Sequence, residues 1–515
     1  MRHLSRRSFL ADVGAGMLAA SVGTGLVRDL GLRSLAADEP DTRLRFGALE
    51  PLAGLMQETP PERLLPALVA RLRAGTELRT LVAAGALANA RAFGGRNYGG
   101  YHHFMALAPA LDMSREFPEP LRPLPVLKVL YRNTAQMQGA RDALAPIESP
   151  AAVAPDAELA LRAAIRARDL GLAERTLAGL VSEPRRALDA IRLVADDDAD
   201  VHRVVLAWRA WSTLDLTGHE HALTLLRQSV RFCLMFEPKP FAPEIRTLLP
   251  DLLTRHGLFD QPRRVAAATD AELSRLCLVV AGPDRTRAAD AAATALAQGM
   301  HSEDVGEAIS LAATLRVLRD PGRGAANGAK RAGTVHGNSI GVHASDAANA
   351  WRNIARASTH RDAAAGLIVA AYYTAGEDGY AHQCGTDYEG VRTLASAWPH
   401  AEHQALIETR DPAALVDQLD AAIRAQDQAR ACAVVHRYGM GGHSARPVLD
   451  VLLRYATSED GALHAEKYYR TASEEFARTR PAFRWRHLAA LARVTASEYG
   501  NPAPGYDEAR RLLEG

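Results

Sequence analysis

Apolar residues recur at helical spacing along almost the whole chain after residue 60, and this periodicity limits the possible folds more than any other feature. It is clear in PERLLPALVARLRAG, which begins at Pro61, and in AALVDQLDAAIRAQDQARACAVVHRYG, which begins at Ala413. A spacing of three and four residues places apolar side chains on one face of a helix. No segment shows the convincing alternation that is typical of a strand. The pattern predicts an all-α protein.

Composition agrees with this prediction. The chain has 515 residues, of which 48% are hydrophobic, enough to build a buried core. It is rich in Ala, Leu and Arg, which lose little rotamer freedom in a helix. Proline and glycine clusters separate the periodic segments, and the longest helix-poor stretch is DPGRGAANGAKRAGTVHGNSIG, residues 320–341. We interpret this stretch as an active-site or binding loop.

The N-terminus is similar to a twin-arginine export signal. Arg6 and Arg7 precede a weakly apolar run rich in Gly and Ala, and small residues follow at Ala36 and Ala37. We therefore expect a signal peptide at residues 1–37, transient contact with the export machinery, and a periplasmic or extracellular location. The alternative is a chance arginine pair before a short buried helix. No later stretch approaches the roughly 20 apolar residues of a membrane span, so we expect no stable membrane insertion after signal removal.

Net charge and cysteine spacing argue against further classes of partner and of site. The chain carries 61 basic and 60 acidic residues, and loss of the signal leaves it close to neutral. Near neutrality argues against nucleic acid as a partner. The four cysteines form no CxxC pair, which leaves buried thiols or at most one or two disulfides. They are Cys233, Cys277, Cys384 and Cys432.

A histidine recurs near the start of four predicted helices. The separations are 99, 141 and 100 residues, consistent with a unit of about one hundred residues that carries one insertion. The four positions are His103, His202, His343 and His443. A second histidine follows the last three of these after 17, 17 and 21 residues, at His219, His360 and His464. The corresponding part of the first unit has Lys128 instead.

This recurrence predicts helical hairpins that pack on one another as a curved solenoid, an α/α toroid or a large bundle. We expect a single domain at residues 38–515, with units at about 60–150, 155–255, 270–390 and 400–515. Antiparallel helices of about fourteen residues place their N-termini roughly 20 Å apart. The first set of histidines then meets only if the units curve around one axis, and the second set gathers at the opposite end. A purely structural role for one of the two sets stays open.

Imidazole is the commonest nitrogen ligand of transition metals and is well suited to proton transfer near neutral pH. We therefore expect both sets as candidate metal ligands, with iron as the first choice and copper or zinc as alternatives. His343, His103, Asp346 and Tyr101 are the candidate catalytic residues. Asp346 shares a helix face with His343 and could act as a ligand or orient one. Lys467 could contact an anionic group, although a solvated side chain is the simpler expectation.

Three segments resemble the His-containing helices of the questin oxidase-like proteins. They are GHEHALTLLRQSVRF, GVHASDAANAWRNIA and GALHAEKYYRTASEE, and the resemblance covers about sixty scattered residues. It implies an all-helical fold and an oxygen-dependent, Baeyer–Villiger-type ring cleavage of polyketide anthraquinones with a reduced nicotinamide nucleotide. It also implicates His103, His219, His343 and His464. An exported chain departs from this pattern because that nucleotide has no steady supply outside the cytoplasm.

The leading interpretation is an exported metal-dependent oxidoreductase that acts on a small cyclic or aromatic molecule held among tyrosines. One alternative is an α-solenoid scaffold in which the histidines only cap helices; it requires histidines that face solvent more than about 10 Å apart, far beyond metal–nitrogen bonds. Another is a metal-free hydrolase or lyase in an α/α toroid. That alternative requires paired carboxylates, and no pair is obvious in the sequence.

Overall fold

The all-α prediction is confirmed in the computed structural model, in which the described residues form helices and no strand beyond two isolated β-bridges. The structure describes residues 43–138, 140, 144–147, 153–259, 265–326, 331–337, 339–376 and 397–515, without the side chain of His360. The predicted signal peptide and Cys384 lie outside these residues. The other three cysteines are buried free thiols.

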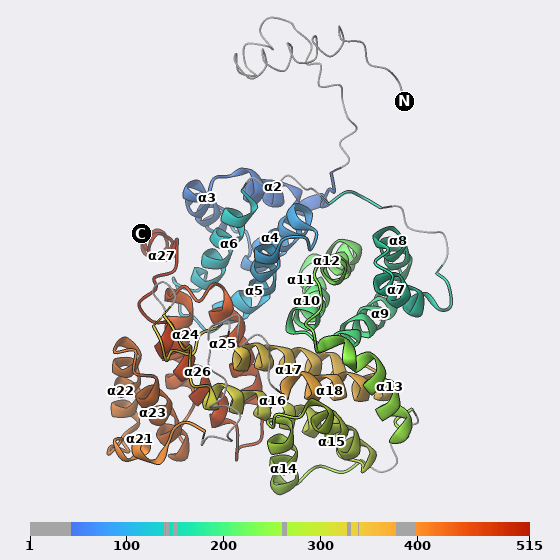
Figure 1. Ribbon diagram of the computed structural model, residues 1–515. Coiled ribbons are helices and arrows are strands. Elements are labelled where there is room, and N and C mark those ends of the chain that lie inside the picture. The colour runs from blue at the N-terminus through green and yellow to red at the C-terminus, as the bar shows by residue number, and fades with distance from the viewer. Residues whose placement is uncertain are drawn as a thin grey trace, which may run out of the picture. The chain divides into compact units, whose positions relative to one another are not determined.

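Four groups of helices follow one another along the chain (Figure 1). The first holds η1 (Gly47–Leu49), α2 (Glu50–Glu58), α3 (Pro61–Arg73), α4 (Leu78–Phe93), α5 (Tyr98–Ser114) and α6 (Leu124–Met137). The second holds α7 (Ala157–Arg166), α8 (Leu170–Leu180), α9 (Pro184–Asp197), α10 (Val201–Ser212), α11 (Leu214–Thr217), η2 (His219–His221), α12 (Ala222–Met235), η3 (Ala242–Glu244) and α13 (Ile245–Arg255).

The third group holds α14 (Asp270–Val280), α15 (Arg285–Ala297), α16 (Ser302–Arg319), α17 (Ile340–Arg356) and α18 (His360–Thr374). The fourth holds α21 (Ala401–Ala405), α22 (Pro412–Arg424), α23 (Gln428–Met440), α24 (Arg446–Ser458), α25 (His464–Arg478), α26 (Trp485–Glu498) and α27 (Tyr506–Glu514). Residues 45–515 make one compact unit. Within the described residues, none of the helices combines the length and apolarity needed to cross a bilayer.

Polar side chains determine where several of these helices begin. The Asn97 side chain accepts a hydrogen bond from the Gly100 N–H at the start of α5. Asp200 accepts bonds from the His202 and Arg203 N–H groups at the start of α10. These side chains satisfy N–H groups that have no partner within the helix. Two of the histidine-bearing helices therefore start at a fixed residue.

One helix from each group joins a ring of four, in which each member packs against the next. Helix α5 contacts α10, α10 contacts α17, α17 contacts α25, and α25 returns to α5. In Figure 1 these four helices surround a common point in the molecule. Each carries a histidine within its first turns. The fold thus brings together residues more than 350 positions apart in the chain.

Candidate metal centre

Four histidines meet in the interior, one from each helix of the ring. They are His102 of α5, His202 of α10, His343 of α17 and His464 of α25. Neighbouring ring centroids lie 5.4 Å apart for His102 and His202, 5.3 Å for His202 and His343, 5.4 Å for His343 and His464, and 5.0 Å for His464 and His102. The four imidazoles form a closed ring, which we call the histidine ring.

The carboxylate that caps α10 also orients His202. Asp200 Oδ1 lies 3.5 Å from His202 Nδ1, and the Tyr98 hydroxyl lies 3.4 Å from His202 Nε2. Burial alone would raise the pKa of Asp200, but its hydrogen bond with His202 and the positive charge of Arg203 bring that pKa below its usual value. Asp200 is therefore ionised. A carboxylate facing one nitrogen of an imidazole keeps the proton there and leaves the lone pair on the other nitrogen.

A backbone carbonyl does the same for His464. Its Nδ1 lies 3.3 Å from the Gly461 carbonyl oxygen, so the N–H is on Nδ1 and the lone pair on Nε2. The backbone that enters α25 is strained, because Ala462 and Leu463 both have positive φ, at 51° and 65°. Non-glycine residues rarely adopt this conformation, and it persists where the surrounding structure enforces it. The strain places His464 as the first residue of its helix.

A buried lysine faces His102. Lys467 Nζ lies 3.0 Å from His102 Nδ1, and the lysine side chain is almost completely buried. Burial lowers the pKa of Lys467 to about 8, although Asp346 and Glu466 oppose the shift. The expectation of a solvated Lys467 was wrong, because α25 turns this side chain toward α5. An amine with such a pKa can exchange a proton at neutral pH.

Two members of the histidine ring, His102 and His343, are uncharged near neutral pH. Burial, the Lys467 charge and the neighbouring imidazoles bring the pKa of His102 well below its usual value. Burial, His202 and Lys467 have the same effect on the pKa of His343. Neutral imidazoles keep the nitrogen lone pairs that a metal ion needs, whereas imidazolium has none.

Aromatic side chains line one side of the histidine ring. The Tyr101 ring stacks on His102 at 4.6 Å and meets Phe232 edge-on at 4.8 Å. Tyr98 contacts Tyr101 at 5.0 Å and Phe236 at 5.7 Å. Tyr98 is 45% exposed, whereas Tyr101 is buried. The wall formed by these four rings therefore runs from the histidine ring to the surface.

Polar contacts hold α17 against α25. Asp346 Oδ1 accepts a 2.7 Å hydrogen bond from Thr471, and Glu475 is bound by Asn349 at 2.8 Å and Arg352 at 2.5 Å. Burial raises the pKa of Asp346, with Lys467 and Thr471 opposing the shift. The predicted role of Asp346 as a metal ligand stays untested. The structure instead places its carboxylate on α25, close enough to Lys467 to influence its charge.

Neighbouring imidazole centroids in the histidine ring are 5.0–5.4 Å apart. This spacing is wider than around a bound metal ion, so the side chains would have to move closer together to bind one ion. Among the described residues, the one group of three side chains whose ligand atoms lie within 4.8 Å of one another is outside the histidine ring, at His400, Glu402 and His403. Imidazole nitrogens are nevertheless donors that suit iron, copper or zinc.

The predicted grouping of the histidines was partly wrong. His202 and His343 meet as expected, but His464, predicted at the opposite end, joins them because α25 begins next to α17. His103 turns away and its Nδ1 lies 2.7 Å from the Gly99 carbonyl oxygen, so its neighbour His102 takes the place in the ring. His443 precedes α24 and packs on a tyrosine.

Two predicted histidines remain, His219 and His360. His219 is an exposed residue of η2, with its ring 6.3 Å from Trp211. His360 opens α18, and its side chain is outside the described residues. Tyr101, predicted as catalytic, lies beside His102 in the aromatic wall.

The predicted loop contributes a close packing contact to the centre. Gly337 donates its N–H to Glu498 Oε1 at 2.8 Å, and a Cβ at this position would lie 2.4 Å from the Cβ of His464. Only glycine lets the loop pass so close to α25. The preceding residue, His336, is buried and contributes to the low pKa of His343. The loop thus packs against His464 through Gly337 and helps to hold it in the histidine ring.

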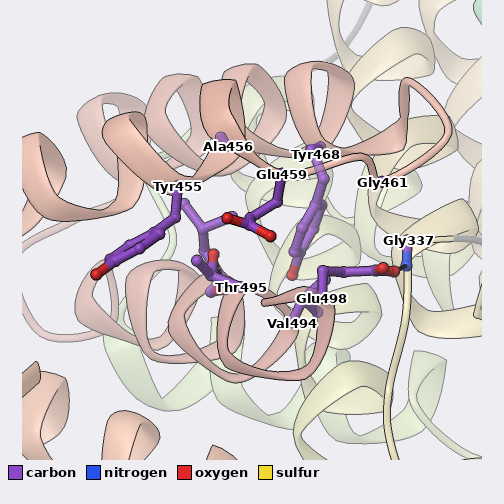
Figure 2. Close-up of a pocket in the computed structure, with 11 residues that line it drawn as sticks. Gly337, Tyr455, Ala456, Glu459, Gly461, Tyr468, Val494, Thr495 and Glu498 are labelled. Atoms are coloured by element: carbon purple, nitrogen blue, oxygen red, sulfur yellow. Dashed lines mark hydrogen bonds between the residues drawn. The ribbon is translucent and has the colours of Figure 1, made fainter. Parts of the chain in front are cut away.

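A small pocket lies on the far side of this loop, and Figure 2 shows two carboxylates in it. Glu459 accepts hydrogen bonds from the Gly500 and Asn501 N–H groups, both at 2.9 Å, and Glu498 holds Gly337. The pocket has a volume of about 20 Å³, room for a single water molecule. Both carboxylates bind backbone groups in a space too small for a sugar, so this pair gives no support to a glycoside-cleaving site.

Comparison with known protein families, with characterised proteins and with solved structures finds no match to this chain.

Proposed function

We propose that the chain is a metal-dependent oxidoreductase whose metal centre is the histidine ring, exported with the signal predicted at residues 1–37. The observation that carries the proposal is the convergence of four imidazoles, three of them buried, from four helices that are distant in the sequence. Iron is the first candidate, with copper and zinc as alternatives, because all three accept imidazole ligands. Close, inward-facing histidines are the opposite of what the scaffold alternative requires.

The aromatic wall indicates the substrate class. Tyr98, Tyr101, Phe232 and Phe236 present ring faces and edges beside the histidine ring, and such surfaces favour flat apolar molecules. The exposed Tyr98 gives the wall an outer end that a molecule in solution can reach. This arrangement supports a cyclic or aromatic substrate and a reaction of the questin oxidase-like type.

The proposed reaction is a monooxygenation. One atom of dioxygen enters the substrate and the other leaves as water, with two electrons from a reduced nicotinamide nucleotide or another two-electron donor. The metal would supply oxygen activation. Lys467 would exchange a proton at its Nζ beside His102, and Asp200 would hold His202 in the tautomer whose Nε2 carries the lone pair.

Metal content tests the proposal directly. Full-length protein is purified without an affinity tag, stripped, reloaded with Fe²⁺ under anaerobic conditions and measured by elemental analysis. We expect about one tightly bound ion per chain and its loss in His343→Ala. His219→Ala is the matched control, because His219 is exposed and distant from the ring. Wild-type protein that takes up no metal, or a His343→Ala variant that retains it, would contradict the proposal.

A further inference from the structure

We propose a second metal site, separate from the histidine ring, in which His400, Glu402 and His403 bind a divalent ion of the zinc type. One ligand atom from each of these side chains lies within 4.8 Å of the other two. His400 occupies the N-cap position of the short helix α21, and Glu402 and His403 lie within that helix.

The three side chains already approach one another without an ion. His400 Nδ1 lies 3.4 Å from Glu402 Oε1, and the His400 and His403 rings are parallel within 12° with centroids 5.1 Å apart. His403 Nδ1 is shielded from solvent and has no hydrogen-bond partner. A buried nitrogen without a partner is costly to maintain, and an ion would satisfy it.

The backbone below this site is anchored to the core. The Trp398 N–H donates a 2.9 Å hydrogen bond to the Leu318 carbonyl, and the buried Arg493 guanidinium lies 3.8 Å from the centroid of the Trp398 ring. Trp398 in turn contacts the His400 and His403 rings at 5.9 and 5.3 Å. Binding therefore requires movement of side chains only, on a base that is already ordered.

The donor set indicates the ion. Two imidazoles and one carboxylate suit Zn²⁺, Ni²⁺ or Cu²⁺, whereas Mg²⁺ and Ca²⁺ prefer oxygen ligands. Ligand atoms around a tetrahedral zinc ion are about 3.4 Å apart, so the side chains must close by about 1 Å. Glu402 is 71% exposed and both histidines are partly exposed, so solvent reaches all three side chains. The open side of the cluster leaves a coordination position for water.

Zinc titration of the tag-free, metal-stripped full-length protein tests this site. The experiment is performed in the His343→Ala background, so that zinc bound by the histidine ring does not obscure the result, and repeated in the wild type. We expect one zinc equivalent that His403→Ala weakens at least tenfold and Glu402→Gln weakens less. His219→Ala is the control for loss of a surface histidine.

Cobalt provides a second readout. Co²⁺ bound at this site should give a visible absorption band that zinc displaces, that His403→Ala abolishes and that His343→Ala leaves in place. The inference would be overturned if the His403→Ala variant bound zinc as tightly as the protein without this change. It would also be overturned if the cobalt band were removed by His343→Ala alone. Neither result depends on metal binding by the histidine ring, so failure of that proposal would be seen separately.

Discussion

At the scale of single residues, the centre depends on the groups that face one ring nitrogen in three of its four imidazoles. Asp200 faces His202, the Gly461 carbonyl faces His464, and Lys467 faces His102. The three partners differ in charge, so they give three differently polarised imidazoles. A ring made only of exposed histidines would have neither this orientation nor the low pKa values that keep His102 and His343 neutral.

Asp200→Asn should weaken metal retention by about 10- to 100-fold, because it removes the negative charge beside His202. Asparagine caps a helix as well as aspartate, so α10 should remain intact. Chelator competition measures the retention. Asp284→Asn is the matched control, since Asp284 caps α15 by the same kind of hydrogen bond, with Arg287 N–H, and lies beside no imidazole of the ring. Equal retention in the two variants would refute the role of Asp200.

Acid should destabilise the metal-free protein through His487. Burial lowers the pKa of His487 to about 4 in the folded state, between the hydroxyls of Thr314 and Thr479. Between pH 6.5 and 4 the unfolded state binds the proton that the folded state does not, so stability falls as pH falls, by about 3 kcal/mol in all. Denaturant unfolding at pH 7, 5.5 and 4 measures this loss. His487→Gln should show a shallower dependence, and an unchanged one would contradict the assignment.

At the scale of helices, the sequence indicates the elements well and their register poorly. Hydrophobic periodicity and caps such as Asn97 and Asp200 predict the helices, and the recurring histidines predict that several meet. The ring histidine, however, follows its N-cap by five residues in α5, two in α10, four in α17 and one in α25. Adjacent residues differ by about 100° around a helix, so an error of one position exchanged His103 for His102.

Two further features could not be read from the sequence. His443 and His464 both stand near helix starts in the fourth group, and only packing against α5 and α17 selects α25. Lys467 is buried because α25 turns it toward α5, and it lies near Asp346 of the distant helix α17. The sequence feature that could have indicated His464 is the pair of small residues that lie beside it, Gly337 and Gly461.

Gly337→Ala should destabilise the protein by about 1–3 kcal/mol and reduce metal retention, because the new methyl group would overlap His464 at a Cβ–Cβ distance of 2.4 Å. Gly366→Ala is the control within α18, where the nearest atom, Trp351 Cδ1, lies at an ordinary 3.6 Å. That change should be neutral or stabilise the helix by up to about 1 kcal/mol. Unfolding curves and metal analysis compare the two. If both variants match the wild type, the loop does not support His464.

At the scale of the whole molecule, a buried ion pair joins the first and fourth groups of helices. Lys128 Nζ of α6 lies 2.8 Å from Glu466 Oε1 of α25 and also donates to the carbonyls of Ala456 and Glu459, at 3.0 and 2.7 Å. Both charged side chains are buried. Lys128 thus ties α25 to the N-terminal part of the chain.

Lys128→Met should lower the free energy of unfolding by about 3–5 kcal/mol, because it leaves the Glu466 carboxylate buried without its counter-ion. The double variant Lys128→Met/Glu466→Gln should recover part of this loss, since no uncompensated charge remains. Denaturant unfolding of both variants gives the comparison. A double variant less stable than the single one would show that the ion pair is not the source of the effect.

The closed ring of α5, α10, α17 and α25 has a consequence for the order of events during biosynthesis. The fourth imidazole belongs to residue 464 of 515, and its helix ends at Arg478. The ring therefore cannot close before the ribosome has passed residue 464. Under the proposed function, the centre would acquire its metal only after α25 has been made, so a chain terminated before His464 would lack both the closed ring and the ion.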